Sequence, residues 1–108
     1  MTIEKMWNGT ELVVALEGRL DTTTSPDLEN MLMEAIPEAE TLVFDLEDLD
    51  YISSAGLRVL LWAQKKMTLR GRMKVKNVKE DIMDVFSITG FTETLDIEQD
   101  EKNADEED

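Results

Sequence analysis

The sequence contains no cysteine and no histidine. Disulfides, cysteine nucleophiles, histidine-based triads and histidine metal ligands are therefore excluded. Aromatic residues make up only 6% of the 108 residues, and no apolar run approaches the ~20 residues of a membrane span. Residues 1–5 do not have the pattern of a signal peptide. We expect a cytoplasmic protein with no membrane partner, of a size that forms one domain.

Acidic side chains outnumber basic ones by 25 to 11, but the two kinds are unevenly distributed. Residues 51–79 hold eight basic side chains and no acidic one. Such a block can bind nucleic acid, but its acidic neighbours would repel phosphates over ~8 Å at physiological salt. We therefore expect a solvated basic helix face and no nucleic-acid partner.

Short apolar segments alternate with amphipathic ones along the chain. Asn8-Gly9 is a strong hairpin signal between the first two strands, and Gly18 is expected to end the second strand. Ser25 is predicted to cap the first helix, with Pro26 at its first position and Pro37 at its end. The hydrophobic periodicity predicts strands at 2–7, 10–17, 41–46, 73–78 and 94–97, and helices at 25–36, from 55 to about 69, and around 82–86.

This order of elements predicts an α/β fold: a small mixed β-sheet of four or five strands, packed against three or four helices. Residues 1–99 form this domain. Residues 100–108 contain six acidic side chains, one lysine and almost nothing apolar. They cannot bury enough apolar surface to offset the entropy of ordering, so we expect an acidic disordered tail.

Two polar segments, residues 18–24 and 47–54, are expected to lie at the carboxyl ends of neighbouring strands, and residues 47–50 are expected to form a turn. Functional loops of α/β sheets gather at that edge. We therefore expect Asp21 and Thr22–Thr24 to lie near Ser54.

The segment 50–57, Asp-Tyr-Ile-Ser-Ser-Ala-Gly-Leu, places Ser53 and Ser54 where a strand leads into a helix. Serine is a favoured N-cap, and Gly56 allows a tight turn or a close approach. Because a helix N-terminus tolerates an anion, a serine there can carry a phosphate without opposing the helix dipole. The alternative interpretation is a capped helix with no further role.

Arg58, Trp62 and Lys65 share one face of the following helix, at positions i, i+4 and i+7. A tryptophan flanked by charges is a candidate interface anchor. The alternative is that Trp62 packs against the sheet or the tail.

Enzymatic chemistry has weak support in the sequence. The acidic residues Asp21, Asp45, Asp48 and Asp50 could form a carboxylate pair or a magnesium site, but acids in turns are usually solvated or capping residues. A phospho-receiver domain would need an acidic pair after the first strand, where this chain has Trp7-Asn8-Gly9. No glycine-rich nucleotide motif is present. We predict no catalytic activity, no cofactor and no metal site.

Residues 47–57, Glu-Asp-Leu-Asp-Tyr-Ile-Ser-Ser-Ala-Gly-Leu, resemble the phosphorylation segment of bacterial anti-sigma factor antagonists, the STAS-domain family. Gly18-Arg19-Leu20-Asp21 is similar to the family's Gly-x-[Leu/Ile]-Asp loop. Phe86-Ser87-Ile88-Thr89-Gly90-Phe91 is similar to its Phe-x-x-[Ser/Thr]-Gly-Leu segment. The ordered set covers nearly the whole chain. It implies a STAS-like fold with Ser54 as the phosphoacceptor, preceded by Ser53 where many members carry Asp.

In this family the unphosphorylated protein captures an anti-sigma factor that is also an ATP-dependent serine kinase, and a sigma factor is released. The kinase inactivates the antagonist by phosphorylation, and a serine phosphatase restores it. The resemblance thus implies a kinase substrate and not an enzyme. A second interpretation is a STAS scaffold or accessory subunit without a phosphoswitch. We expect the partner-binding surface to comprise Asp21, Thr22, Ser53, Ser54, Gly56, Arg58 and Trp62.

Overall fold

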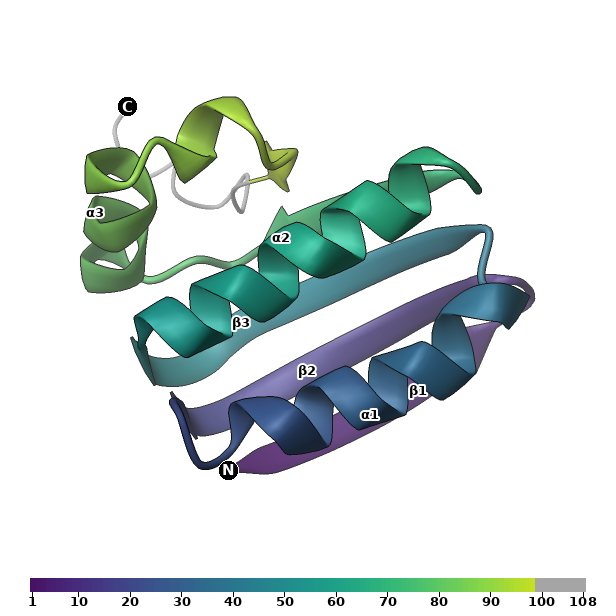
Figure 1. Cartoon of the computed structure of the whole chain (residues 1–108), viewed down its shortest axis with the longest axis horizontal. Helices are drawn as coiled ribbons and strands as arrows, with labels where there is room; N and C mark the ends of the chain where they lie inside the picture. Colours follow the sequence, from purple (N-terminus) through teal and green to yellow (C-terminus); the bar gives the residue numbers. More distant parts are fainter. Residues whose placement is uncertain (99–108) are drawn as a thin grey trace, which may run out of the picture.

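Five strands form one mixed sheet in the order β1-β2-β3-β4-β5 (Figure 1). The structure is a computed structural model that describes residues 1–98; the expected tail at 100–108 lies outside the described residues. β1 is antiparallel to β2, and the other neighbouring strands are parallel. The mixed sheet confirms the predicted α/β fold. The strands are β1 Thr2–Asn8, β2 Glu11–Leu20, β3 Thr41–Ile52, β4 Arg72–Lys76 and β5 Ile97–Glu98.

The predicted hairpin is present, but its turn lies one residue later than expected. Asn8 pairs with Glu11, so Gly9 and Thr10 form the two-residue connection. Gly9 has φ +64°, in the left-handed region that glycine enters without steric cost. The turn therefore forms where glycine can occupy its first position.

β2 and β3 are both longer than the sequence predicted. Gly18 does not end β2: it has φ +101° and lies at a register shift, and the strand continues to Leu20. The predicted turn at 47–50 is wrong, because β3 runs through it to Ile52. There, Leu49 and Ile52 are buried while the acidic side chains face solvent. Pairing with the extended β2 supplies backbone hydrogen bonds to this segment, and its polar sequence alone did not indicate that pairing.

Within residues 1–98, three α-helices and two short 3₁₀ helices connect the strands. Figure 1 shows α1 and α2 side by side across one face of the sheet, as right-handed parallel crossovers require. The predicted cap at Ser25 is wrong: Thr24 occupies the N-cap position, and Ser25 is the buried first residue of α1. The helices are α1 Ser25–Ala35, η1 Ile36–Glu38, α2 Ser54–Thr68, α3 Glu80–Ile88 and η2 Phe91–Glu93.

The hydrophobic core lies between the sheet and these helices. Leu12, Val14 and Leu16 of β2 and Leu42, Phe44 and Leu46 of β3 are buried in this core, with the period-2 spacing of a strand. Phe44 on β3 and Phe86 on α3 are the largest fully buried side chains. None of the helices within residues 1–98 is long and apolar enough to cross a bilayer.

Candidate partner-binding site

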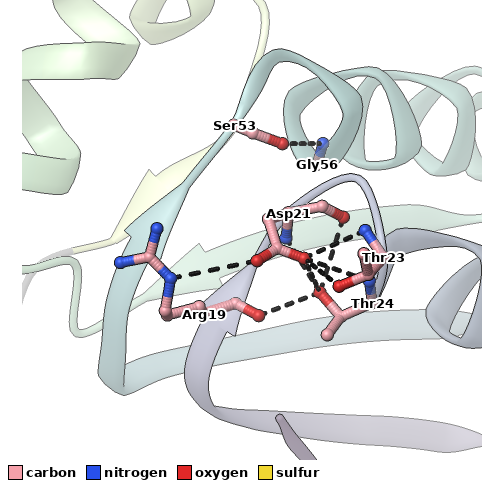
Figure 2. Close-up of polar contacts among 6 residues, drawn as sticks. All are labelled: Arg19, Asp21, Thr23, Thr24, Ser53 and Gly56. Carbon is pink, nitrogen blue, oxygen red and sulfur yellow. Dashed lines mark hydrogen bonds and ion pairs between the residues drawn. The ribbon is translucent and has the colours of Figure 1, made fainter.

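The two polar segments meet at the carboxyl ends of β2 and β3, as expected. The backbone N–H of Ser53 donates a hydrogen bond to the Leu20 carbonyl at 2.9 Å, directly after the last paired residues of the two strands. Figure 2 shows Ser53 and the Asp21 loop at this shared end. A backbone hydrogen bond therefore holds the start of α2 against the end of β2.

The two serines at the start of α2 have different roles. Ser53 is the N-cap, and its hydroxyl oxygen accepts a hydrogen bond from the Gly56 N–H at 3.4 Å. Ser54 is the first helical residue and is exposed. Within the described part of the chain, its hydroxyl makes no hydrogen bond, and the N–H groups of Ser54 and Ala55 have no acceptor. One hydroxyl thus holds the helix end, and the other is accessible.

Gly56 is buried where α2 crosses the ends of β2 and β3. A Cβ atom at this position would lie 2.8 Å from Leu20 Cγ and 2.9 Å from Ile52 Cγ1. The glycine therefore permits the first turn of α2 to approach the sheet closely. We infer that Gly56 contributes to the site by placing Ser54, and not by touching a partner.

Asp21 organises the loop that faces the start of α2. Its Oδ1 accepts hydrogen bonds from the Thr23 N–H at 3.0 Å, the Thr23 hydroxyl at 2.8 Å and the Thr24 N–H at 3.2 Å (Figure 2). Arg19 Nε lies 3.8 Å from Oδ2. The Thr23 hydroxyl is the main cause of a lowered pKa at Asp21; the backbone N–H groups of Thr24 and Thr23 also lower it, and partial desolvation opposes them. The ionised carboxylate thus holds the loop in one shape.

We expect Asp21→Asn to weaken the acid dependence of stability. A carboxylate with a lowered folded-state pKa stabilises the fold above its unfolded pKa, and this stabilisation is lost as the pH falls through the folded value. The free energy of unfolding of wild type should therefore fall more steeply than that of the variant below the ordinary value of 3.8. Denaturant unfolding between neutral and acid pH measures both slopes. Asp84→Asn, at an exposed position on α3, is the control; equal slopes for wild type and Asp21→Asn would contradict this role.

Three of the predicted partner-binding residues line a hollow between α1 and α2. This near hollow has a volume of about 280 Å³ and includes Thr22, Arg58 and Trp62. Trp62 is half-buried and packs against the core, so it both packs and lines an open surface. Lys65, expected on the same face, is exposed and does not line the hollow. The remaining lining residues are Ser25, Pro26, Glu29, Ala55 and Val59.

Two polar contacts beside the site were not expected from the sequence. The Arg19 guanidinium lies over the Tyr51 ring, 4.1 Å from its centroid. Lys79 Nζ lies 2.7 Å from an Asp50 carboxylate oxygen, a hydrogen bond that raises the pKa of Lys79. Arg19 and Tyr51 are paired across β2 and β3, so only knowledge of the strand register could have linked them.

The acidic residues near the site act as structural hydrogen-bond acceptors. Asp45 Oδ1 accepts hydrogen bonds from the Glu47 N–H at 3.1 Å and from Asn77 Nδ2 at 3.0 Å. Among residues 1–98, no three acidic side chains are grouped so as to hold a metal ion. The arrangement presents an accessible hydroxyl, a fixed loop and a hollow, which are features of a protein-binding surface.

Comparison with known proteins places these features in a family. The STAS domain model matches residues 3–104. BtrV of Bordetella bronchiseptica, provisionally assigned as an anti-sigma factor antagonist, is 37% identical over 82 residues, which are 74% of this chain and 71% of BtrV. The anti-sigma F factor antagonist of Paenibacillus polymyxa is 31% identical over 96 residues, covering 86% of this chain and 82% of the relative.

Solved structures show the same fold. The anti-sigma factor antagonist SpoIIAA in its unphosphorylated form superposes with a TM-score of 0.74 at 19% identity, over 98% of this chain and 96% of that one. SpoIIAA of Bacillus in its phosphorylated form gives 0.73 at 20% identity, over 99% and 100% of the two chains. The mixed sheet and its helices therefore have the same fold as SpoIIAA.

Proposed function

This chain belongs to the STAS-domain family, and we propose that it is an anti-sigma factor antagonist regulated by phosphorylation at Ser54. In this proposal the unphosphorylated form binds an anti-sigma factor that is also a serine kinase, and thereby releases a sigma factor in the cytoplasm. The chain is a substrate of that kinase and of a serine phosphatase. ATP is bound by the kinase, so this chain needs no cofactor of its own.

The observation that carries the proposal is that the two serines have different structural roles. The Ser53 hydroxyl is engaged in capping α2, whereas the Ser54 hydroxyl is exposed one residue later. A kinase needs an accessible hydroxyl on a well-defined backbone. Ser54 meets both requirements. Its side chain is exposed, and the backbone just before it is fixed by the hydrogen bond from the Ser53 N–H to the Leu20 carbonyl at the end of β2.

The start of α2 also explains how a phosphate could be accommodated without unfolding. The N–H groups of Ser54 and Ala55 have no acceptor among the described residues, and a helix N-terminus favours negative charge. A phosphate on Ser54 therefore does not oppose the helix dipole. At a protein interface the same group would bring an added charge of about -1.5 to -2, which is costly to bury unless it is paired.

The proposed partner surface surrounds Ser54 at one end of the molecule. Asp21 and Thr22 come from the loop before α1, and Ser53 and Ser54 from the start of α2. Arg58 and Trp62 extend the surface along α2 through the near hollow. SpoIIAA, which has this fold, has been solved with and without phosphate, and this precedent supports a switch in the present chain.

The proposal is tested by mapping phosphorylation with the cognate kinase and ATP. We expect one phosphate on wild type, located at Ser54 by mass spectrometry, and none on Ser54→Ala. Ser53→Ala should still be labelled, although loss of the cap should cost about 0.5–2 kcal/mol of stability. Circular dichroism of each variant checks that it is folded. A folded Ser54→Ala that is labelled as well as wild type would contradict the assignment.

A further inference from the structure

Figure 1 shows α1 and α2 side by side. Two hollows lie between them, both lined by Trp62, and we call the two together the groove. Its second half, the far hollow, has a volume of about 290 Å³. Trp62 lines both hollows and so marks the boundary between them. The far hollow is lined by Met33, Ile36, Pro37, Trp62, Lys66 and Arg70.

The α2 side of the groove is a continuous row of side chains. Arg58, Trp62 and Lys66 follow one another on α2 at intervals of four residues, which places them on one helix face. Arg70 lies two residues beyond Thr68, where the helix ends. Lys66 is 12 residues beyond Ser54, or about 18 Å along the helix at 1.5 Å per residue. The Arg70 guanidinium donates a hydrogen bond to the Pro37 carbonyl and so bridges the end of the groove. The far hollow is therefore well separated from the proposed phosphorylation site.

The far hollow combines an apolar floor with a cationic rim. Met33 is 58% exposed, and Trp62 is only half-buried. Among residues 1–98, no acidic side chain lines this hollow. Within residues 1–98, no carboxylate forms an ion pair with Lys66 or Arg70. Lys66 is thus available to an occupant, and Arg70, which already donates one hydrogen bond to the Pro37 carbonyl, offers its remaining N–H groups next to exposed apolar surface.

We propose that the far hollow binds an acidic amphipathic helix of a partner protein. An apolar side chain of that helix would enter beside Met33 and Trp62, and its carboxylates would pair with Lys66 and Arg70. A helix lying in a groove presents anchors at i, i+3, i+4 and i+7, and tryptophan and arginine are the residues most often found at interface hot spots. This docking site lies apart from Ser54, although Trp62 also belongs to the proposed anti-sigma factor surface.

Two other occupants fit the hollow less well. Residues 99–108 of the chain itself have the right charge, but Ala104 is their only apolar side chain, so they cannot fill an apolar floor. The acidic helices of a second copy, α1 and α3, bury most of their apolar faces in that copy's own core, so they offer little apolar surface to the hollow. A separate protein with one acidic, amphipathic helix satisfies both the charge and the apolar surface.

The test uses synthetic helical peptides of about 15 residues, long enough to span the groove. The probe carries leucines at i, i+3, i+4 and i+7, glutamates at positions flanking them, and alanines elsewhere, because glutamates throughout would repel one another and destabilise the helix. One control peptide has the same composition in scrambled order, and another has lysine in place of glutamate. Titrated into the ¹⁵N-labelled full chain, the probe should shift the amide signals of Met33, Trp62 and Lys66, and the controls should not. Equal shifts with the scrambled peptide, or no shifts with the probe, would overturn the proposal.

Charge reversal at adjacent positions makes the test specific to the groove. Lys66→Glu should weaken binding of the probe by at least about tenfold, because it replaces attraction with repulsion at close range. Lys65→Glu makes the same change of charge one residue away, outside the groove, and should leave the affinity within about threefold. Equal losses in the two variants would show non-specific attraction and overturn the proposal.

The same titration separates this inference from the proposed function. Ser54→Asp should bind the probe peptide as wild type does, even if it no longer binds the anti-sigma factor. Loss of probe binding in Ser54→Asp would overturn the claim of a site apart from Ser54. Concentration-dependent dimerisation that is abolished by Met33→Glu would assign the far hollow to a second copy of the chain. That result would also overturn the proposal of an acidic partner helix.

Discussion

Replacing Ser54 by aspartate should lower the affinity for the anti-sigma factor by about 100-fold or more. Each ~1.4 kcal/mol lost in binding is a tenfold change in affinity, and an unpaired charge buried at an interface costs several kcal/mol. Ser54 is exposed at the start of α2, so in the proposed complex a carboxylate there would meet the partner directly. Isothermal titration calorimetry or surface plasmon resonance with the purified partner measures this loss.

The fold should be unaffected by the same substitution. A negative charge in the first turn of a helix is stabilising by ~0.3–1 kcal/mol, because it interacts with the positive end of the helix dipole. The melting temperature of Ser54→Asp should therefore be equal to or above that of wild type. A loss of binding without a loss of stability would identify an effect at the interface rather than a damaged fold.

Two control variants make the result specific. Ser54→Ala removes the hydroxyl without adding charge and should bind within about threefold of wild type, since its truncation removes no charged contact. Ser87→Asp makes the same chemical change at an exposed position on α3 and should leave binding unchanged. If Ser54→Asp binds as tightly as wild type, the phosphoswitch is wrong and the non-switching scaffold becomes the better description.

Replacing Gly56 by alanine should destabilise the fold by up to about 2 kcal/mol, although the same replacement usually stabilises a helix. In an ordinary helix interior, alanine is ~1 kcal/mol more favourable than glycine. Here the new Cβ would lie 2.8 Å from Leu20 Cγ and 2.9 Å from Ile52 Cγ1, and overpacking of this kind costs typically ~1–3 kcal/mol. The steric cost should prevail, because both neighbours are buried and cannot move freely.

Gly56→Ala should also disturb the proposed partner surface. Relief of the clash moves the first turn of α2 away from β2 and β3, and Ser54 moves with it. We therefore expect Gly56→Ala to weaken binding of the anti-sigma factor as well as to lower the free energy of unfolding. Denaturant titration and calorimetry measure the two effects on the same sample.

A double-mutant cycle identifies the cause. Leu20→Ala removes two of the three atoms that the new Cβ would meet and leaves Ile52 Cγ1 in place, at a cost of about 2–5 kcal/mol by itself. In that background, Gly56→Ala should be clearly less destabilising than in wild type, so the two changes should be non-additive. Simple additivity of the two losses would show that close packing against Leu20 is not the reason for the glycine.

Local sequence signals determined the order of strands and helices and the place of Ser54. The apolar periodicity within residues 41–46 and 55–69 is a property of neighbouring residues, so it identified β3 and α2 before any tertiary contact was known. The preference of serine for helix N-termini likewise placed Ser53 and Ser54 at the start of a helix. It did not show which hydroxyl would be the cap.

Tertiary structure decided the features that depend on residues far apart in the chain. The polar residues 47–50 belong to β3 only because the extended β2 pairs with them, and Gly56 is buried only because α2 lies against Leu20 and Ile52. The groove brings Met33 of α1 beside Lys66 of α2, although neither residue has a local signal for binding. The sequence by itself thus determined the elements and the candidate hydroxyl, whereas strand lengths, the choice of cap and both hollows depend on long-range packing, which local periodicity does not encode.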